Sequence, residues 1–151
     1  MKVLFWTGKF WPEIGGTATF ATRLLPILQQ RGYEFLVVAA QTHPGQSLQD
    51  CFEGIPIERF FFFFSDSYKM IDRLSAIKQR VKCLKRAFSP DLIHLSTLSL
   101  SQFFHLETRK ESSSRVVVTL HGFQDPSSQA PEIHATMGKK ILNYAGWGRR
   151  T

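Results

Sequence analysis

The chain has 151 residues, of which 43% are hydrophobic and 21% charged, so its composition predicts one globular domain rather than a disordered segment. A formal net charge of +7 favours anionic partners such as phosphates, nucleic acid or an acidic membrane surface, although it is equally consistent with a Lys- and Arg-rich surface that binds nothing. The two cysteines, Cys51 and Cys83, are too few and too far apart for a disulfide framework, so we expect reduced, mostly buried thiols.

The N-terminus begins with an apolar run of only four residues, Val3-Leu4-Phe5-Trp6. A secretory signal requires an apolar stretch of about 7–15 residues, and a membrane span requires about 20. We therefore expect a cytoplasmic protein. The same short run is typical of a strand that is buried on both faces of a parallel sheet.

Buried strands of this kind alternate with helices along the chain. The strands are centred near residues 4, 37, 59, 93 and 118, and the helices are predicted from Thr17 as N-cap to Gly32, over 69–87, from about 99 to 110, and around 133–145. Residues 41–52 are predicted to be a polar loop. This alternation predicts an α/β fold with a Rossmann-like, doubly wound parallel sheet.

Five consecutive phenylalanines, residues 60–64, follow the third predicted strand. They favour a core strand, because aromatic residues suit a buried sheet. A surface on which bases or sugars stack is the alternative.

The helix predicted over 69–87 combines an apolar stripe with a basic face. The stripe consists of Met70, Leu74, Ile77, Val81, Leu84 and Phe88. The basic residues are Lys69, Arg73, Lys78, Arg80, Lys82, Lys85 and Arg86. Such a helix lies either on an anionic membrane or, with a solvated face, on the outside of an α/β domain. We favour the second interpretation and keep peripheral membrane contact as an alternative.

Three features fall at the carboxyl ends of predicted strands, where open parallel sheets bind ligands. The doublet Gly15-Gly16 precedes a helix N-terminus, which favours phosphate oxygens, but a plain turn explains it equally well. His94 ends the fourth strand and is either a core residue or part of a site. His121-Gly122 ends the fifth strand, where His121 can donate to a sugar hydroxyl. No metal-binding cluster or nucleophile elbow is present.

Four segments together resemble the large retaining glycosyltransferase family 4. They are Phe10-Trp11-Pro12-Glu13-Ile14-Gly15-Gly16, Gln30-Arg31-Gly32-Tyr33-Glu34, Ser89-Pro90-Asp91-Leu92-Ile93-His94 and Val117-Val118-Thr119-Leu120-His121-Gly122. The resemblance covers residues 2 to about 122. It implies the N-terminal, acceptor-side lobe of a GT-B architecture, in which two Rossmann-like lobes enclose the active site.

The resemblance also implies roles for individual residues. Gly15 and Gly16 would bind the donor diphosphate, His121 would be catalytic beside the transferred sugar, and His94 and Gly122 would line the substrate site. The partners would be a nucleotide-sugar donor and a sugar or lipid-linked acceptor, with no metal or other cofactor. Ser96 stands where many members have a second histidine.

The end of the sequence departs from the family pattern. Residues 146–151 are polar and glycine-rich, where the family continues into a sixth strand and a donor-binding lobe. We therefore expect an incomplete domain over residues 1–151 that is inactive alone, or a non-catalytic lobe that pairs with a separate donor-binding chain. A nucleic-acid-binding domain is disfavoured, because the aromatic residues do not alternate with Lys and Arg.

Overall fold

The computed structural model describes residues 1–62, 70–96 and 101–121. The chain divides into two compact units, Met1–His121 and Gly122–Thr151, and all described residues belong to the first. The predictions for the last helix and for residues 146–151 lie outside the described residues.

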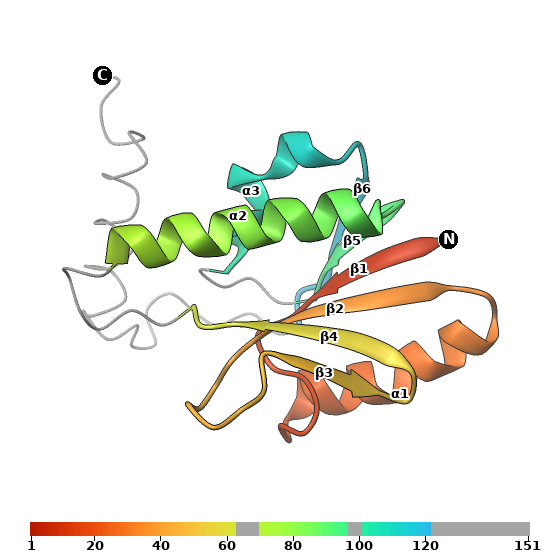
Figure 1. Ribbon diagram of the computed structural model, residues 1–151. Coiled ribbons are helices and arrows are strands. Elements are labelled where there is room, and N and C mark those ends of the chain that lie inside the picture. The colour runs from red at the N-terminus through yellow and green to blue at the C-terminus, as the bar shows by residue number, and fades with distance from the viewer. Residues whose placement is uncertain (63–69, 97–100, 122–151) are drawn as a thin grey trace, which may run out of the picture. The chain divides into compact units, whose positions relative to one another are not determined.

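The described unit contains a six-stranded sheet with helices on both faces. The strands are β1 (Lys2–Trp6), β2 (Glu34–Ala40), β3 (Gln49–Phe52), β4 (Ile55–Phe60), β5 (Leu92–Leu95) and β6 (Arg115–Val118). Their order is β3-β4-β2-β1-β5-β6, and every pairing is parallel except that of β3 with β4. The helices are α1 (Gly16–Gln30), α2 (Met70–Phe88), α3 (Gln102–Glu107) and the 3₁₀ turn η1 (Arg109–Glu111). Figure 1 shows α1 on one face and α2 with α3 on the other, which confirms the predicted fold.

Strand β3 corrects the prediction of a polar loop over 41–52. It joins β4 through the two-residue turn Glu53-Gly54, in which both residues have positive φ, 49° and 81°. A turn of this kind matches the twist of an antiparallel hairpin. The strand was missed because its residues are polar or half exposed, as an edge strand allows.

The start of α1 differs from the prediction. Thr17 was predicted as the N-cap, but the helix begins immediately after Gly15, with no side-chain capping hydrogen bond. The predicted end is confirmed: Gly32 follows the helix with φ of 85°, and its N–H donates to the carbonyl of Gln29 at 2.9 Å.

The central strands are buried on both faces, as a parallel sheet with two helical layers requires. On the α1 face, Val3, Phe5, Val37 and Ile57 pack around Leu25. On the opposite face Phe60 and Phe62 are buried, with their rings stacked at a centroid distance of 5.7 Å. Phe61 between them is 37% exposed, so the core prediction holds for alternate members of the phenylalanine run; Phe63 and Phe64 lie outside the described residues.

The buried side of α2 includes a lysine. Leu74 and Val81 of the predicted stripe are buried, but Lys85, predicted on the solvated face, is fully buried as well. Both cysteines are exposed, so the prediction of buried thiols is wrong: Cys51 lies on edge strand β3, and Cys83 lies on α2, where it lines a groove between that helix and the sheet.

Candidate functional site

The loop between β1 and α1 carries Gly15 and Gly16 to the carboxyl edge of the sheet. A Cβ atom added at either glycine would meet no atom within 4 Å, so packing within the chain does not require glycine there. The first bond of α1 runs from the N–H of Thr19 to the carbonyl of Gly15 at 2.8 Å. The N–H groups that precede Thr19 therefore lack intrahelical partners and can bind an anion.

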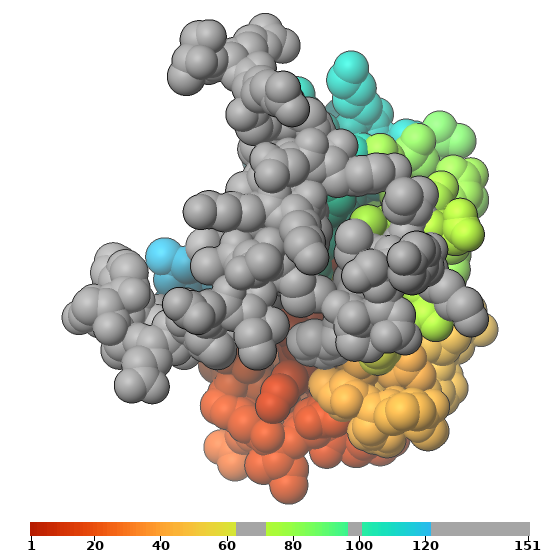
Figure 2. All heavy atoms as spheres, turned by 90° about the vertical axis from the view of Figure 1, so that its left-hand side faces the viewer, coloured from red at the N-terminus to blue at the C-terminus, as the bar shows by residue number. Residues whose placement is uncertain are grey.

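Polar side chains from β4 and from the segment after β2 hold this loop in place. Arg59 of β4 is fully buried and donates to the carbonyl of Trp11 at 2.5 Å and to the carboxylate of Asp50 at 3.0 Å. The hydroxyl of Thr42 donates to the carboxylate of Glu13. Figure 2 shows the loop after β1 (red) beside the segment that follows β2 (yellow-orange). No local sequence pattern predicted that Arg59 would support the glycine loop.

Strands β5 and β6 bring four polar side chains to the α1 face of the sheet. His94 and Ser96 come from the end of β5, and Thr119 and His121 from the segment after β6, at alternate positions that share one face. The Nε2 atom of His94 lies 2.8 Å from the hydroxyl of Thr119. The Nε2 atom of His121 lies 3.1 Å from the hydroxyl of Ser96. These two pairs form a ladder between the strand ends.

The two histidines of this ladder differ in exposure. His94 is half-buried and packs edge-on against Phe5, with ring centroids 5.0 Å apart. Burial lowers the pKa of His94, and the nearby His121 lowers it further. His121 is exposed. His94 is thus a hydrogen-bonded neutral side chain near neutral pH, whereas His121 is accessible to a ligand.

A ring contact links the histidine ladder to the glycine loop. Phe20, in the first turns of α1, lies edge-on to His121 with ring centroids 5.4 Å apart. Of the residues predicted from the sequence, Gly15 and Gly16 therefore lie at the start of the helix that contacts His121, and His94 lies in the same ladder as His121. Gly122 falls outside the described residues.

The basic helix carries less free charge than its sequence suggests. Four of its cations contact carboxylates; the pairs are Lys78–Glu107 at 2.7 Å, Arg80–Glu58 at 2.7 Å, Lys82–Glu111 at 3.5 Å and Arg86–Glu111 at 2.7 Å. These pairs tie α2 to β4, α3 and η1, which accounts for much of its charge without an external partner.

The buried Lys85 is held by α3 and the residue that follows it. Its Nζ atom lies 3.0 Å from Nδ1 of His105 and 3.2 Å from each of the carbonyls of His105 and Thr108. Burial lowers the pKa of Lys85 to about 8, against a smaller opposing effect of Glu111. Burial and the Lys85 charge lower the pKa of His105 to about 4. This cluster joins α2 to α3 inside the protein and does not reach the strand-end site.

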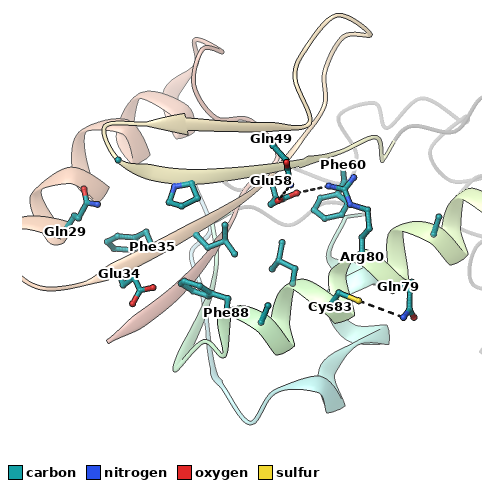
Figure 3. A pocket seen from close by; sticks show the side chains of 16 residues that line it. Gln29, Glu34, Phe35, Gln49, Glu58, Phe60, Gln79, Arg80, Cys83 and Phe88 are labelled. Atoms are coloured by element: carbon teal, nitrogen blue, oxygen red, sulfur yellow. Dashed lines mark hydrogen bonds and ion pairs between the residues drawn. The ribbon is translucent and has the colours of Figure 1, made fainter.

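A groove of about 990 Å³ lies on the α2 face of the sheet, opposite the histidine ladder. Figure 3 shows Phe35, Phe60 and Phe88 around it, with Arg80 reaching Glu58. The groove is largely apolar and shares no residue with the ladder or the glycine loop.

The part of the chain that the structure describes lacks two kinds of feature. In that part of the chain, no three or more His, Cys, Asp and Glu side chains gather as metal ligands would. Within the same residues, no helix has the length and apolar character that crossing a membrane requires.

Known glycosyltransferases resemble this chain in sequence. A family model described as Glycosyltransferase Family 4 matches residues 14–150. The chain is 22% identical to a GDP-mannose-dependent alpha-mannosyltransferase of Mycobacterium tuberculosis, in an alignment that covers 97% of this chain and 37% of that protein.

Two solved structures share the fold. Sucrose-phosphate synthase from Thermosynechococcus elongatus superimposes with a TM-score of 0.62 at 16% identity, over 93% of this chain and 40% of that one. The apo form of the lipopolysaccharide outer core galactosyltransferase WaaB gives a TM-score of 0.53 at 16% identity, over 80% of this chain and 32% of that one. The chain therefore spans about two fifths or less of the length of these proteins.

Proposed function

The chain belongs to Glycosyltransferase Family 4, and we propose that it forms the acceptor-side, N-terminal part of a GT-B enzyme. The reaction would transfer a sugar from a nucleotide-sugar donor to a sugar or lipid-linked acceptor, with retained configuration. His121 would be the catalytic residue, and Gly15, Gly16, His94 and Gly122 would bind the donor or substrate.

The observation that carries this proposal is the contact between Phe20 and His121, with ring centroids 5.4 Å apart. It brings the helix that follows the glycine loop beside the exposed histidine at the end of β6. A phosphate group at the start of α1 and a sugar at His121 are the two halves of a nucleotide-sugar donor. The position at the carboxyl ends of parallel strands, beside strands β1 and β5, suits such a ligand.

The chemistry requires more positive charge than the N–H groups at the start of α1 supply to a diphosphate. As the bond between sugar and phosphate oxygen breaks, the leaving diphosphate gains charge that preorganised groups must stabilise. The N–H groups at the start of α1 supply partial charges only. We therefore expect full cationic groups to come from a donor-binding part, and we expect the 151 residues alone to show no measurable transfer.

A second form of the proposal assigns the chain a non-catalytic role. In that form, it supplies one lobe to a separate chain that binds the donor. The two forms differ in whether the donor-binding part must be covalently joined.

The experiment assays release of nucleoside diphosphate, beginning with GDP-mannose as donor. The chain is tested alone, joined in frame to a donor-binding lobe of the family, and mixed with that lobe in trans. We expect activity in a combined form, and His121→Ala should reduce it without changing the circular dichroism spectrum. Robust transfer by the 151 residues alone would place the donor site elsewhere. Equal activity of His121→Ala and the wild type would remove His121 from the proposal.

A cytoplasmic location and peripheral membrane contact through helix 69–87 stay predictions. The ion pairs of α2 leave fewer cations for anionic lipid than its sequence suggests. Lys85 is buried and cannot reach a membrane surface. Membrane contact through Lys78, Arg80, Lys82 or Arg86 would therefore compete with the ion pairs that hold α2 to the domain.

A further inference from the structure

Ser96 lies directly behind the exposed histidine of the candidate site. Its side chain is fully buried, and its backbone N–H donates to the carbonyl of Trp6 at 2.8 Å, which fixes its position relative to β1. Among the described residues, the hydrogen-bond partner of its hydroxyl is Nε2 of His121, at 3.1 Å. The hydroxyl is therefore paired with one ring nitrogen and shielded from water.

Burial decides the direction of this hydrogen bond. A serine hydroxyl has one proton to donate, and a buried donor without an acceptor is unfavourable by about 1–3 kcal/mol. If Nε2–H donated to Ser96, the serine proton would have no acceptor among the described residues. If Ser96 donates to the lone pair of Nε2, both atoms are satisfied. The remaining proton of a neutral imidazole must then reside on Nδ1.

We propose that Ser96 is a positioning residue that holds neutral His121 in the Nδ1–H tautomer. The exposed imidazole then presents an N–H donor to its ligand. Because the lone pair of Nε2 is already engaged by Ser96, His121 acts as a hydrogen-bond donor to a sugar hydroxyl or phosphate oxygen rather than as a general base. The identity of that ligand rests on the proposed function, whereas the tautomer does not.

The neighbouring pair in the ladder provides an internal contrast. His94 contacts the hydroxyl of Thr119 at 2.8 Å, but Thr119 is only partly buried, so its hydroxyl can also reach water. Burial therefore does not force a direction on this second hydrogen bond. Thr119→Val removes a hydroxyl from the same ladder without touching the Ser96–His121 pair, and it is a matched control.

The test is the tautomer of His121 in the 151-residue chain, measured by long-range ¹H–¹⁵N correlation with ¹⁵N-labelled histidine. The measurement is made at about pH 8, so that the neutral form of the imidazole is observed. His121→Gln identifies the signals by their loss. We expect Nδ1–H in the wild type. In Ser96→Ala, the ratio of the two tautomers should shift about two- to tenfold toward Nε2–H, the range for one net hydrogen bond.

Ser96→Thr retains the hydroxyl and should restore the wild-type ratio, and Thr119→Val should leave it unchanged. A wild-type chain with Nε2–H, or a folded Ser96→Ala chain with an unaltered ratio, would overturn the proposal. If Ser96→Ala does not fold, the wild type and Ser96→Thr still decide the tautomer. Absence of sugar transfer in the combined enzyme would refute the proposed function and leave the tautomer assignment standing.

Discussion

Raising the pH should stabilise this protein over a range in which many proteins lose stability, because of the buried Lys85. Its pKa is lowered to about 8, whereas the same side chain in the unfolded chain has an ordinary value of 10.5. Between these two values the unfolded chain keeps a proton that the folded chain has released. The free energy of unfolding therefore rises with pH across this window.

The size of the effect follows from the two pKa values. The pKa of Lys85 is about 8 in the folded chain and 10.5 in the unfolded chain. Because a pKa difference of one corresponds to about 1.4 kcal/mol, the free energy of unfolding should rise by about 3 kcal/mol across this window. Lys85 is fully buried, so water does not screen this contribution as it would at an exposed lysine. In the neutral form, the amine still donates to two of its three acceptors, so deprotonation relieves the burial of a charge and gives up one hydrogen bond.

The assay is urea unfolding at several pH values between 7.5 and about 10.5, followed by the fluorescence of the buried Trp6, whose ring centroid lies 6.2 Å from that of His105. Lys85→Met should change the free energy of unfolding at every pH, and it should abolish the rise of that free energy with pH that we assign to Lys85. Lys78→Met removes a half-buried lysine of the same helix and should retain the rise. An equal rise in wild type and Lys85→Met would refute the assignment to Lys85.

Three other changes have defined outcomes. Lowering the pH from about 6.5 to about 4 should reduce the free energy of unfolding, because the pKa of His105 is lowered to about 4, and His105→Gln should remove part of that loss in the same urea assay. Arg59→Met should destabilise by about 3 kcal/mol, because it leaves the carbonyl of Trp11 and a partly buried carboxylate unpaired, whereas Arg80→Met at the surface should change stability by about 0–1 kcal/mol in parallel melts. If helix 69–87 contacts membranes, cosedimentation with anionic vesicles should weaken steeply with salt; equal binding to neutral vesicles would identify its basic side as a solvated face.

The parallel strands were predictable because each is a short apolar run that must be buried on both faces. Strand β3 carries no such signal, since an edge strand exposes one side and can remain polar. The dipeptide Glu53-Gly54 before a predicted strand was the available clue, because a two-residue turn that ends in glycine indicates a hairpin.

Contacts between distant residues account for what the sequence did not indicate. Lys85 is buried because three acceptors at His105 and Thr108 surround it, and no pattern within α2 reveals those partners. Arg59 likewise reaches Trp11 and Asp50 from other elements. The positions of Gly15 and His121 at strand ends followed from a general rule for parallel sheets, but the pairing of His121 with Ser96 required the adjacency of β5 and β6.

The β3–β4 hairpin also imposes an order on folding. Its partners are close in sequence, as Gln49 pairs with Glu58, whereas parallel strands can pair only after a long crossover connection has closed. Hairpins form in about 1–10 μs, so we expect this one to precede the rest of the sheet. The phenylalanine-rich end of β4 then stays exposed until β2 docks beside it. Aggregation of this chain should accordingly depend on how quickly β2 pairs with the preformed hairpin, and faster docking should raise the yield of refolding without changing the stability of the native state.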